Sequence, residues 1–281
     1  MTNISSLQAE NQINQTNMSL QTVLQQLSSG SRINNGSDDP AGLAIADGLG
    51  ANITALTQSG QNATDAVGMS QVADGALSQV TTLLNRAITL ATQASTGTEG
   101  TGQLTALDNE FTSIKNEIDA IGSSTTYNGT AVFGQGSVGV YLSDGTTTGT
   151  QTVSVDFESL GSANLGTTGT SSSPTAVSIA GDNLTTAADA QTALADLNSA
   201  VAGIANFQGN LGSSVDQLQA ASSVLTTQVQ NLTSAQSNIT SADVTKDVGL
   251  MSQYNVLQQT GMAALQQANQ MQQSVVKLLQ S

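Results

Sequence analysis

The fold of this chain is decided by residues 190–239, which read AQTALADLNSAVAGIANFQGNLGSSVDQLQAASSVLTTQVQNLTSAQSNI. Steps of seven from Ala190 reach an apolar residue every time, as in the stripe of a coiled coil. These positions are Ala190, Leu197, Ile204, Leu211, Leu218, Leu225, Leu232 and Ile239. The stripe predicts one helix of about 50 residues, roughly 75 Å long at a rise of 1.5 Å per residue.

Two further apolar stripes, with spacings of three and four residues, lie in residues 43–95 and 103–121. The three stripes can bury one another in an antiparallel bundle with short or moderate connections. We therefore expect a mainly α protein with an elongated, coiled-coil-like bundle of long helices, formed by residues 43–121 and 186–242. Its expected core residues are Leu49, Ile53, Leu56, Leu84, Ile88, Leu197, Ile204, Leu211, Leu218, Leu225 and Leu232.

Residues 122–185 carry a different pattern of short alternating runs. The run Val138–Leu142 is joined to the run Thr152–Phe157 by turn-forming residues such as Ser-Asp-Gly at 143–145, which predicts a β-hairpin. The stretch 161–174 is rich in Gly, Ser and Thr, and we interpret it as an exposed loop.

The two ends, residues 1–42 and 243–281, show helical apolar spacing, and Glu10 is the only charge in residues 1–31 and Lys277 the only one after Asp247. Helices exposed to water normally carry charged outer faces, so we expect neighbouring helices to enclose these ends as a terminal helical pair. The enclosing helices belong either to further copies of the chain or to its own opposite end, and the pattern leaves both readings open. The apolar residues concerned are Leu20, Leu24, Leu27, Ile33, Leu250, Tyr254, Leu257, Ala264, Met271, Val275 and Leu278.

Composition excludes several chemistries. The sequence contains no His and no Cys, so it offers no Ser-His-Asp triad, no thiolate nucleophile and no zinc, haem or iron-sulfur site of the usual kinds. We expect no enzyme activity, no cofactor and no metal site. Twenty acidic residues against five basic ones give a net charge of -15, which argues against binding to nucleic acid or anionic membranes. The first 25 residues lack the basic and apolar regions of a secretory signal peptide.

Carboxylates occur in two clusters that could suggest chemistry. Asp38 and Asp39 precede Pro40, a sequence that is far more typical of a helix start than of a general acid and base. Asp108, Glu110, Glu117 and Asp119 could hold calcium, but their spacing spreads them around a helix. We interpret this second cluster as a solvated helix face.

Two segments at opposite ends of the chain resemble the signatures of bacterial flagellin. At the N-terminal end, LSSGSRIN at 27–34 and DDPAGLAIA at 38–46 resemble one signature, and LQQTG at 257–261 with ANQ at 268–270 resembles the other. The resemblance implies a structural subunit that polymerises into the flagellar filament for motility. It implies that residues 1–42 and 243–281 form the inner filament core and order on assembly. Residues 122–185 would leave little or no separate outer domain.

The resemblance also implies partners and a location. These are further copies of the chain, the flagellar cap and hook-junction proteins, and an export chaperone that holds the C-terminal segment. The protein would reach the extracellular filament by type III export without a cleaved signal peptide. A hook-filament junction protein of the same architecture is the alternative reading.

Two groups of surface residues complete the predictions. Arg86 precedes Leu90-Ala91-Thr92-Gln93, and with Glu110 it is similar to the contact that flagellins offer to the animal Toll-like flagellin receptor. Hydroxyl groups in the central loop are candidates for O-linked glycans. They are Thr167, Thr168, Thr170, Ser171 and Ser172.

Overall fold

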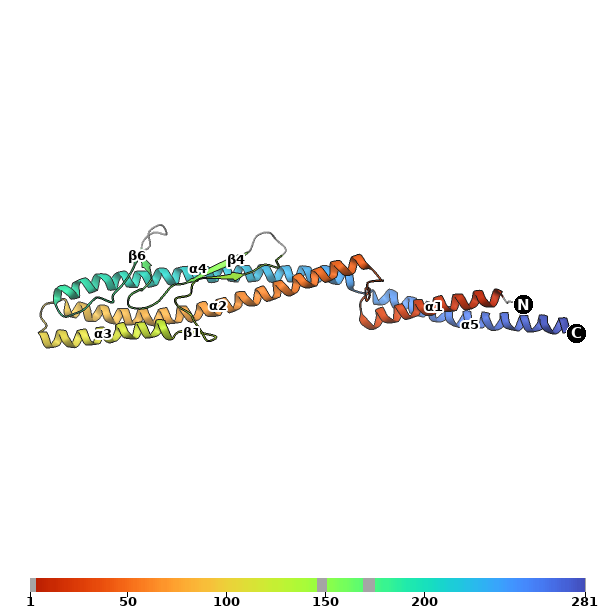
Figure 1. Cartoon of the computed structure of the whole chain (residues 1–281), viewed down its shortest axis with the longest axis horizontal. Helices are drawn as coiled ribbons and strands as arrows, with labels where there is room; N and C mark the ends of the chain where they lie inside the picture. The colour runs from red at the N-terminus through yellow and green to blue at the C-terminus, as the bar shows by residue number, and fades with distance from the viewer. Residues whose placement is uncertain (1–3, 146–150, 169–174, 281) are drawn as a thin grey trace. The chain divides into compact units, whose positions relative to one another are not determined.

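The computed structural model describes residues 4–145, 151–168 and 175–280, without the side chains of 167, 168, 175 and 275–280. The described chain is mainly α-helical (Figure 1). Its helices are α1 (Ile4–Ser29), α2 (Pro40–Ala94), α3 (Thr101–Ser124), α4 (Ala187–Thr240) and α5 (Val244–Gln280). The 54-residue α4 confirms the long helix predicted from the heptad stripe.

Short antiparallel pairs of strands lie between α3 and α4. They are β1 (Thr126–Tyr127) with β2 (Thr130–Ala131), β3 (Gly136–Tyr141) with β4 (Thr152–Phe157), and β5 (Thr167–Thr168) with β6 (Thr175–Ala176). The β3–β4 pair, in which Val138 faces Val155, confirms the predicted hairpin. Asn128 and Gly129 both have positive φ in the tight turn between β1 and β2, the backbone conformation that an Asn-Gly turn favours.

The chain divides into two compact units. One consists of Met1–Ile53 with Gln230–Ser281, and we call it the terminal unit; the other is Thr54–Val229, the bundle unit.

The core of the bundle unit lies where the apolar faces of α2, α3 and α4 meet. Side chains at the heptad positions of α4 from Ala190 to Leu225 are buried, as are Leu77 and Leu84 of α2 and Ile118 of α3. The helix α2 runs without a break through Gly60 and Asp74, where its apolar stripe is interrupted. Burial of continuous apolar faces therefore outweighs the lower helix propensity of these two residues.

The start of α2 follows the predicted capping. The Asp39 carboxylate accepts a hydrogen bond from the backbone N–H of Gly42 at 2.9 Å, and Pro40 is the first helical residue. Asp38 instead accepts hydrogen bonds from the backbone N–H groups of Asn34 and Asn35. Both carboxylates thus satisfy backbone donors, which confirms the helix-start reading of this pair.

The interpretation of residues 161–174 as an exposed loop is wrong for the part that the structure describes. Leu165 is completely buried, and residues Gly161 to Gly166 pack against the bundle. A Cβ on Gly203 of α4 would lie 2.6 Å from the carbonyl oxygen of Leu165, so the backbones approach too closely for any side chain. The glycines that suggested a loop therefore serve close packing.

The α3 carboxylates lie on a solvated face, as interpreted, since Glu110, Glu117 and Asp119 are exposed and Asp108 is half-buried, but three of them also make contacts. Asp108 accepts a hydrogen bond from the backbone N–H of Leu184 at 2.8 Å, and Asp119 accepts two from Ser162. Glu110 pairs with Arg86. Asp108 and Asp119 thus fasten the segment that precedes α4 to the bundle, a role that helical spacing alone could not reveal.

In the terminal unit, α1 lies antiparallel beside α5 (Figure 1). The helices approach each other closely at Gly261, where an added Cβ would lie 2.8 Å from Cγ1 of Ile13. The side chains of Thr16 and Val23 are buried in α1, and that of Ala268 in α5. The two chain ends therefore pair within one molecule, as one of the two open readings expected.

Candidate assembly surface

Large apolar side chains are exposed mainly on the terminal unit. Among the described residues, all but Val72, Tyr141 and Val224 of the exposed large hydrophobic residues belong to it. They are Ile4, Leu7, Met18, Leu24, Ile45, Val244, Val248, Val256, Leu257, Met262 and Met271. Pairing of α1 with α5 thus leaves a further apolar surface uncovered.

The helix α1 has two apolar faces. Thr16 and Val23 face α5 and are buried, whereas Ile4, Leu7 and Met18 are 52–68% exposed. At 3.6 residues per turn, these two sets lie on roughly opposite sides of the helix. Glu10 is the only charged residue of α1, so the second face has almost no charge to keep it in water.

The helix α5 repeats this arrangement. Val248 and Val256 are 42% and 60% exposed, while Asp247 and Ala268 are buried on the other side. The polar residues between them are largely Gln, Asn, Ser and Thr. These uncharged groups can form hydrogen bonds inside a packed interface without the cost of burying a charge. The surface can therefore be covered by further helices of similar composition.

A junction between the two connecting segments closes one end of the pair. Arg32 donates a backbone hydrogen bond to the carbonyl of Thr240 at 2.6 Å, and Ala242 donates one to the carbonyl of Gly30 at 3.1 Å. The guanidinium Nη2 of Arg32 donates to the carbonyl of Ile239 at 2.9 Å, in the last turn of α4. A cation at this position satisfies a free carbonyl and complements the helix dipole.

The residues predicted for assembly all belong to the terminal unit but differ in exposure. Ile33 is buried. The exposed ones are Leu24, Leu257, Ala264 and Met271, and the half-buried ones are Leu20, Leu27, Leu250 and Tyr254. The side chains of Val275 and Leu278 lie outside the described residues. Sequence reasoning missed Met18 and Val256, although their distance from the inward stripe on a 3.6-residue helix was a usable signal.

The residues predicted for the bundle core are buried to different degrees. Leu56, Leu84, Leu197, Ile204, Leu211, Leu218 and Leu225 are buried, and Leu49, Ile53, Ile88 and Leu232 are half-buried. Leu49, Ile53 and Leu232 belong to the terminal unit.

Arg86 and Glu110, the predicted receptor contact, lie side by side on α2 and α3. The Nη2 and Nε atoms of Arg86 are 2.6 Å and 2.8 Å from the same Oε1 of Glu110. Their side chains are 55% and 45% exposed, so the pair is accessible on the bundle unit. The structure thus brings together two residues that are 24 positions apart in the sequence.

The candidates for glycosylation fall at the edge of what the structure describes. Thr167 and Thr168 form β5, without described side chains, and Thr170, Ser171 and Ser172 lie outside the described residues.

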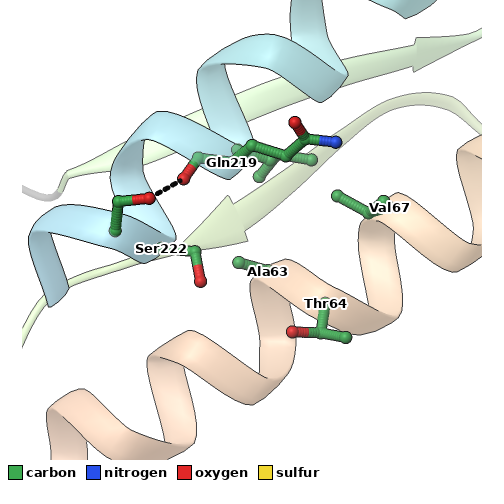
Figure 2. Close-up of a pocket in the computed structure, with 7 residues that line it drawn as sticks. Ala63, Thr64, Val67, Gln219 and Ser222 are labelled. Carbon is green, nitrogen blue, oxygen red and sulfur yellow. Dashed lines mark hydrogen bonds between the residues drawn. The ribbon is translucent and has the colours of Figure 1, made fainter. Parts of the chain in front are cut away.

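The bundle unit has shallow grooves between α2 and α4. One groove has a volume of about 310 Å³ and is lined by small and uncharged side chains such as Ala63, Val67, Gln219 and Ser222 (Figure 2). It contains no ionisable side chain that could transfer a proton. Within the described residues, no cluster of three or more His, Cys, Asp or Glu could hold a metal ion. None of the described helices has the length and apolar character needed to cross a membrane.

Comparison with protein families decides the identity of the chain. Residues 1–137 match the family model for the bacterial flagellin N-terminal helical region, and residues 194–279 match that for the bacterial flagellin C-terminal helical region. The chain belongs to the bacterial flagellin family. This confirms the resemblance drawn from residues 27–46 and 257–270.

Individual relatives agree with this assignment. The chain is 37% identical to a flagellin of Salmonella muenchen over 168 residues, which cover 59% of this chain and 32% of that one. It is 38% identical to a flagellin of Escherichia coli O127:H6 over 171 residues, covering 60% and 30%. The chain thus spans about a third of the length of the curated relatives that it matches. The crystal structure of Bacillus cereus flagellin is similar with a TM-score of 0.47 and 26% identity, covering 63% of this chain and 94% of that one.

Proposed function

We propose that this chain is a structural, non-enzymatic subunit that polymerises with its own copies into the bacterial flagellar filament. The observation that carries the proposal is the uncharged apolar surface on α1 and α5, represented by Met18 and Val256. Membership of the flagellin family supports the same conclusion. Residues 1–42 and 243–281 would form the inner core of the filament.

Burial between copies supplies the energy for this assembly. Covering an exposed Val, Leu or Met side chain contributes about 1.5–3 kcal/mol when its burial is complete. Ordering the backbone costs about 1–2 kcal/mol per residue, so helices with so little charge and so much exposed apolar area gain stability mainly from neighbours. We infer that the terminal helices order as subunits join the polymer.

The bundle domain, residues 43–121 and 186–242, and the hairpin region, residues 122–185, would surround that core. Most acidic residues of the chain belong to the bundle unit, whose sequence contains only two basic residues, Arg86 and Lys115. Such a surface is suited to solvent, because a high net charge favours solubility. The short central region would then add little or no separate outer domain.

Two valines provide a matched test of the assembly surface. Val256 on α5 is 60% exposed and Val224 on α4 is 56% exposed. We expect Val256→Asp to abolish or greatly slow filament formation, because each copy would bury an unpaired charge. Val224→Asp should affect polymerisation far less. Sedimentation and electron microscopy of purified subunits measure both, and equal polymerisation of the two variants would refute the proposal.

The same experiment separates a filament subunit from a hook-filament junction protein. A junction protein would stop at a short ring, whereas a filament subunit grows to micrometre lengths from the unsubstituted chain. We expect long filaments.

Export and its partners follow from the proposed role. We propose that the chain travels unfolded through the flagellar type III route without a cleaved signal peptide and is added beneath a cap protein. An export chaperone would cover the apolar face of α5 before assembly, since Val248, Val256 and Met262 are exposed on it. Co-purification of the chain with such a chaperone should be lost on removal of residues 248–281.

Two surface features of the bundle unit are proposed to face outward in the filament. The exposed Arg86–Glu110 pair would contact the Toll-like flagellin receptor of animals. Arg86→Ala should then reduce receptor activation without changing polymerisation. O-linked glycans would be attached within residues 167–172, and intact-mass measurement of filaments taken from cells should reveal them.

A further inference from the structure

The antiparallel pair of α1 and α5 has a single observed register. Three contacts along the two helices define this register: Ser6 with Asn269, Ile13 with Gly261, and Asn17 with Gln258. The register fixes which residues of α1 and α5 remain outward. It therefore decides the shape of the exposed apolar surface described above.

The helix pair itself contains little that would enforce this register. Among the described side chains no ion pair joins α1 to α5, and Glu10 is the only charged residue of α1. The facing polar residues are mostly interchangeable Gln, Asn, Ser and Thr. Charged residues flanking the apolar seam are what normally distinguish one alignment of paired helices from another. A shift by one helical turn would therefore be weakly opposed within the pair.

The junction beside the pair is the part that fixes its alignment. Gly30 directly follows α1, and Ala242 lies two residues before α5. Antiparallel pairing of Ser31 with Ser241, and the two backbone hydrogen bonds around it, hold these segments together. The end of α1 and the start of α5 are consequently fixed relative to each other over a few residues.

Arg32 connects this junction to helices on both sides. Its guanidinium donates to the carbonyl of Ile239 in α4, and its own carbonyl accepts a hydrogen bond from Nε2 of Gln26 in α1 at 2.9 Å. It belongs to the few cations of the chain and lies where the last carbonyls of a helix lack partners within the helix. No other residue at the junction combines a charged donor with contacts to two helices among the described residues.

We infer that Arg32 is a positioning residue that sets the register of α1 against α5, and with it the assembly surface that a subunit presents. The inference concerns the pairing within one chain, so it does not depend on the filament proposal. It also assigns a physical role to the arginine in LSSGSRIN.

Engineered cysteines can read the register directly, because the chain has none of its own. A Cβ on Gly261 would be adjacent to the Ile13 side chain, so Ile13→Cys with Gly261→Cys places two thiols within bridging distance. The smaller cysteine at position 13 also removes the clash that a side chain at 261 would otherwise meet. Ile13→Cys with Leu257→Cys, and with Leu265→Cys, report shifts of one helical turn in either direction.

The experiment compares the yield of intrachain disulfide for each pair after mild oxidation, in soluble and in pelleted chains separately. With Arg32 present, the 13–261 pair should dominate. Arg32→Ala should lower the ratio of the 13–261 bridge to the shifted bridges roughly two- to tenfold, the range given by a net hydrogen-bond contribution of ordinary size. Arg32→Lys, which keeps a cationic donor, should restore part of the ratio.

Arg86→Ala is the control, since it removes another exposed arginine from the bundle unit and should leave the ratio unchanged. Circular dichroism shows whether every variant keeps its helix content. An unchanged ratio in Arg32→Ala, or no 13–261 bridge in the parent chain in either fraction, would overturn the inference. If the chain formed no filaments but the ratio of the 13–261 bridge to the shifted bridges still changed in Arg32→Ala, only the proposed function would be contradicted.

Discussion

The carboxylate of Asp119 on α3 accepts two hydrogen bonds from Ser162, one from its backbone N–H at 2.6 Å and one from its hydroxyl at 3.0 Å. Ser162 is buried, and it lies in the segment that carries the completely buried Leu165. A residue on a helix thereby fastens a stretch that has no regular structure of its own. The stability of the bundle unit should depend on this contact.

Replacing this carboxylate tests the dependence. Asp119→Ala should lower the free energy of unfolding by about 1–3 kcal/mol, because a buried donor of Ser162 loses its charged partner. Glu117→Ala is the matched control on the same helix, since Glu117 is exposed and has no hydrogen bond among the described residues. Denaturant unfolding of the soluble chain measures both. Equal losses would show that Asp119 acts only through general helix effects.

The close approach at Gly203 predicts opposite effects for two similar substitutions in α4. Gly203→Ala should destabilise the bundle unit by about 1–3 kcal/mol, because the new methyl group would lie 2.6 Å from the carbonyl oxygen of Leu165. Gly209→Ala has open space around its Cβ and should stabilise the helix by about 0.5–1 kcal/mol. Thermal unfolding of each variant gives the sign. A stabilising Gly203→Ala would mean that residues 161–166 do not pack as described.

Asp182 predicts a pH dependence of stability. Burial, followed by the negative charge of Asp196, raises the pKa of Asp182, and Lys115 partly opposes this shift. The folded protein therefore binds the proton of the Asp182 carboxyl group more tightly than the unfolded chain does. This protonation stabilises the fold at pH values below the ordinary pKa of aspartate, and the stabilisation is lost as the pH rises through the raised pKa of Asp182. Among described atoms, Oδ2 of Asp182 is buried without a hydrogen-bond partner.

Asp182→Asn removes that ionisation. The variant should be more stable than the parent near neutral pH, and its advantage should shrink on acidification through the pKa of Asp182. Urea unfolding at a series of pH values measures the difference, with Asp189→Asn on α4 as a second acidic site for comparison. A constant difference at every pH would contradict the assignment.

The Arg86–Glu110 pair should contribute little to folding despite its short distance. Both side chains are about half exposed, so water and salt screen the attraction. A double-mutant cycle with Arg86→Ala and Glu110→Ala should give a coupling of about 0.2–1 kcal/mol that falls as ionic strength rises. A coupling well above this range would indicate a structural role rather than an accessible surface pair.

Periodicity in the sequence was sufficient to locate the long helices. In α4 the heptad positions from Ala190 to Leu225 are buried, because an apolar stripe of this length can be satisfied only as one helix face. The β3–β4 hairpin and the capping of α2 by Asp39 were predictable for similar reasons. Each depends on residues that are close in sequence.

Local sequence could not decide contacts between distant segments. Asp119 is exposed on α3, as its spacing predicts, and only the fold shows that it also accepts hydrogen bonds from Ser162. Gly203 is an ordinary small residue in the heptad pattern until the backbone of Leu165 is placed against it. The composition of residues 161–166 suggests a loop for the same reason, since glycine is common both in loops and at close backbone approaches.

The sequence by itself determined that this chain forms long helices, that residues 1–31 and 248–281 carry one charged side chain each, and that it belongs with flagellins, because period, composition and motif are properties of the linear chain. Only the tertiary structure decided which apolar face of each terminal helix is buried against the other terminal helix of the same chain. Pairing of α1 with α5 buries Val23 and leaves Met18 and Val256 outside. A helix with two apolar faces does not reveal in its sequence which one its own partner covers, since that choice depends on the register between residues more than two hundred positions apart.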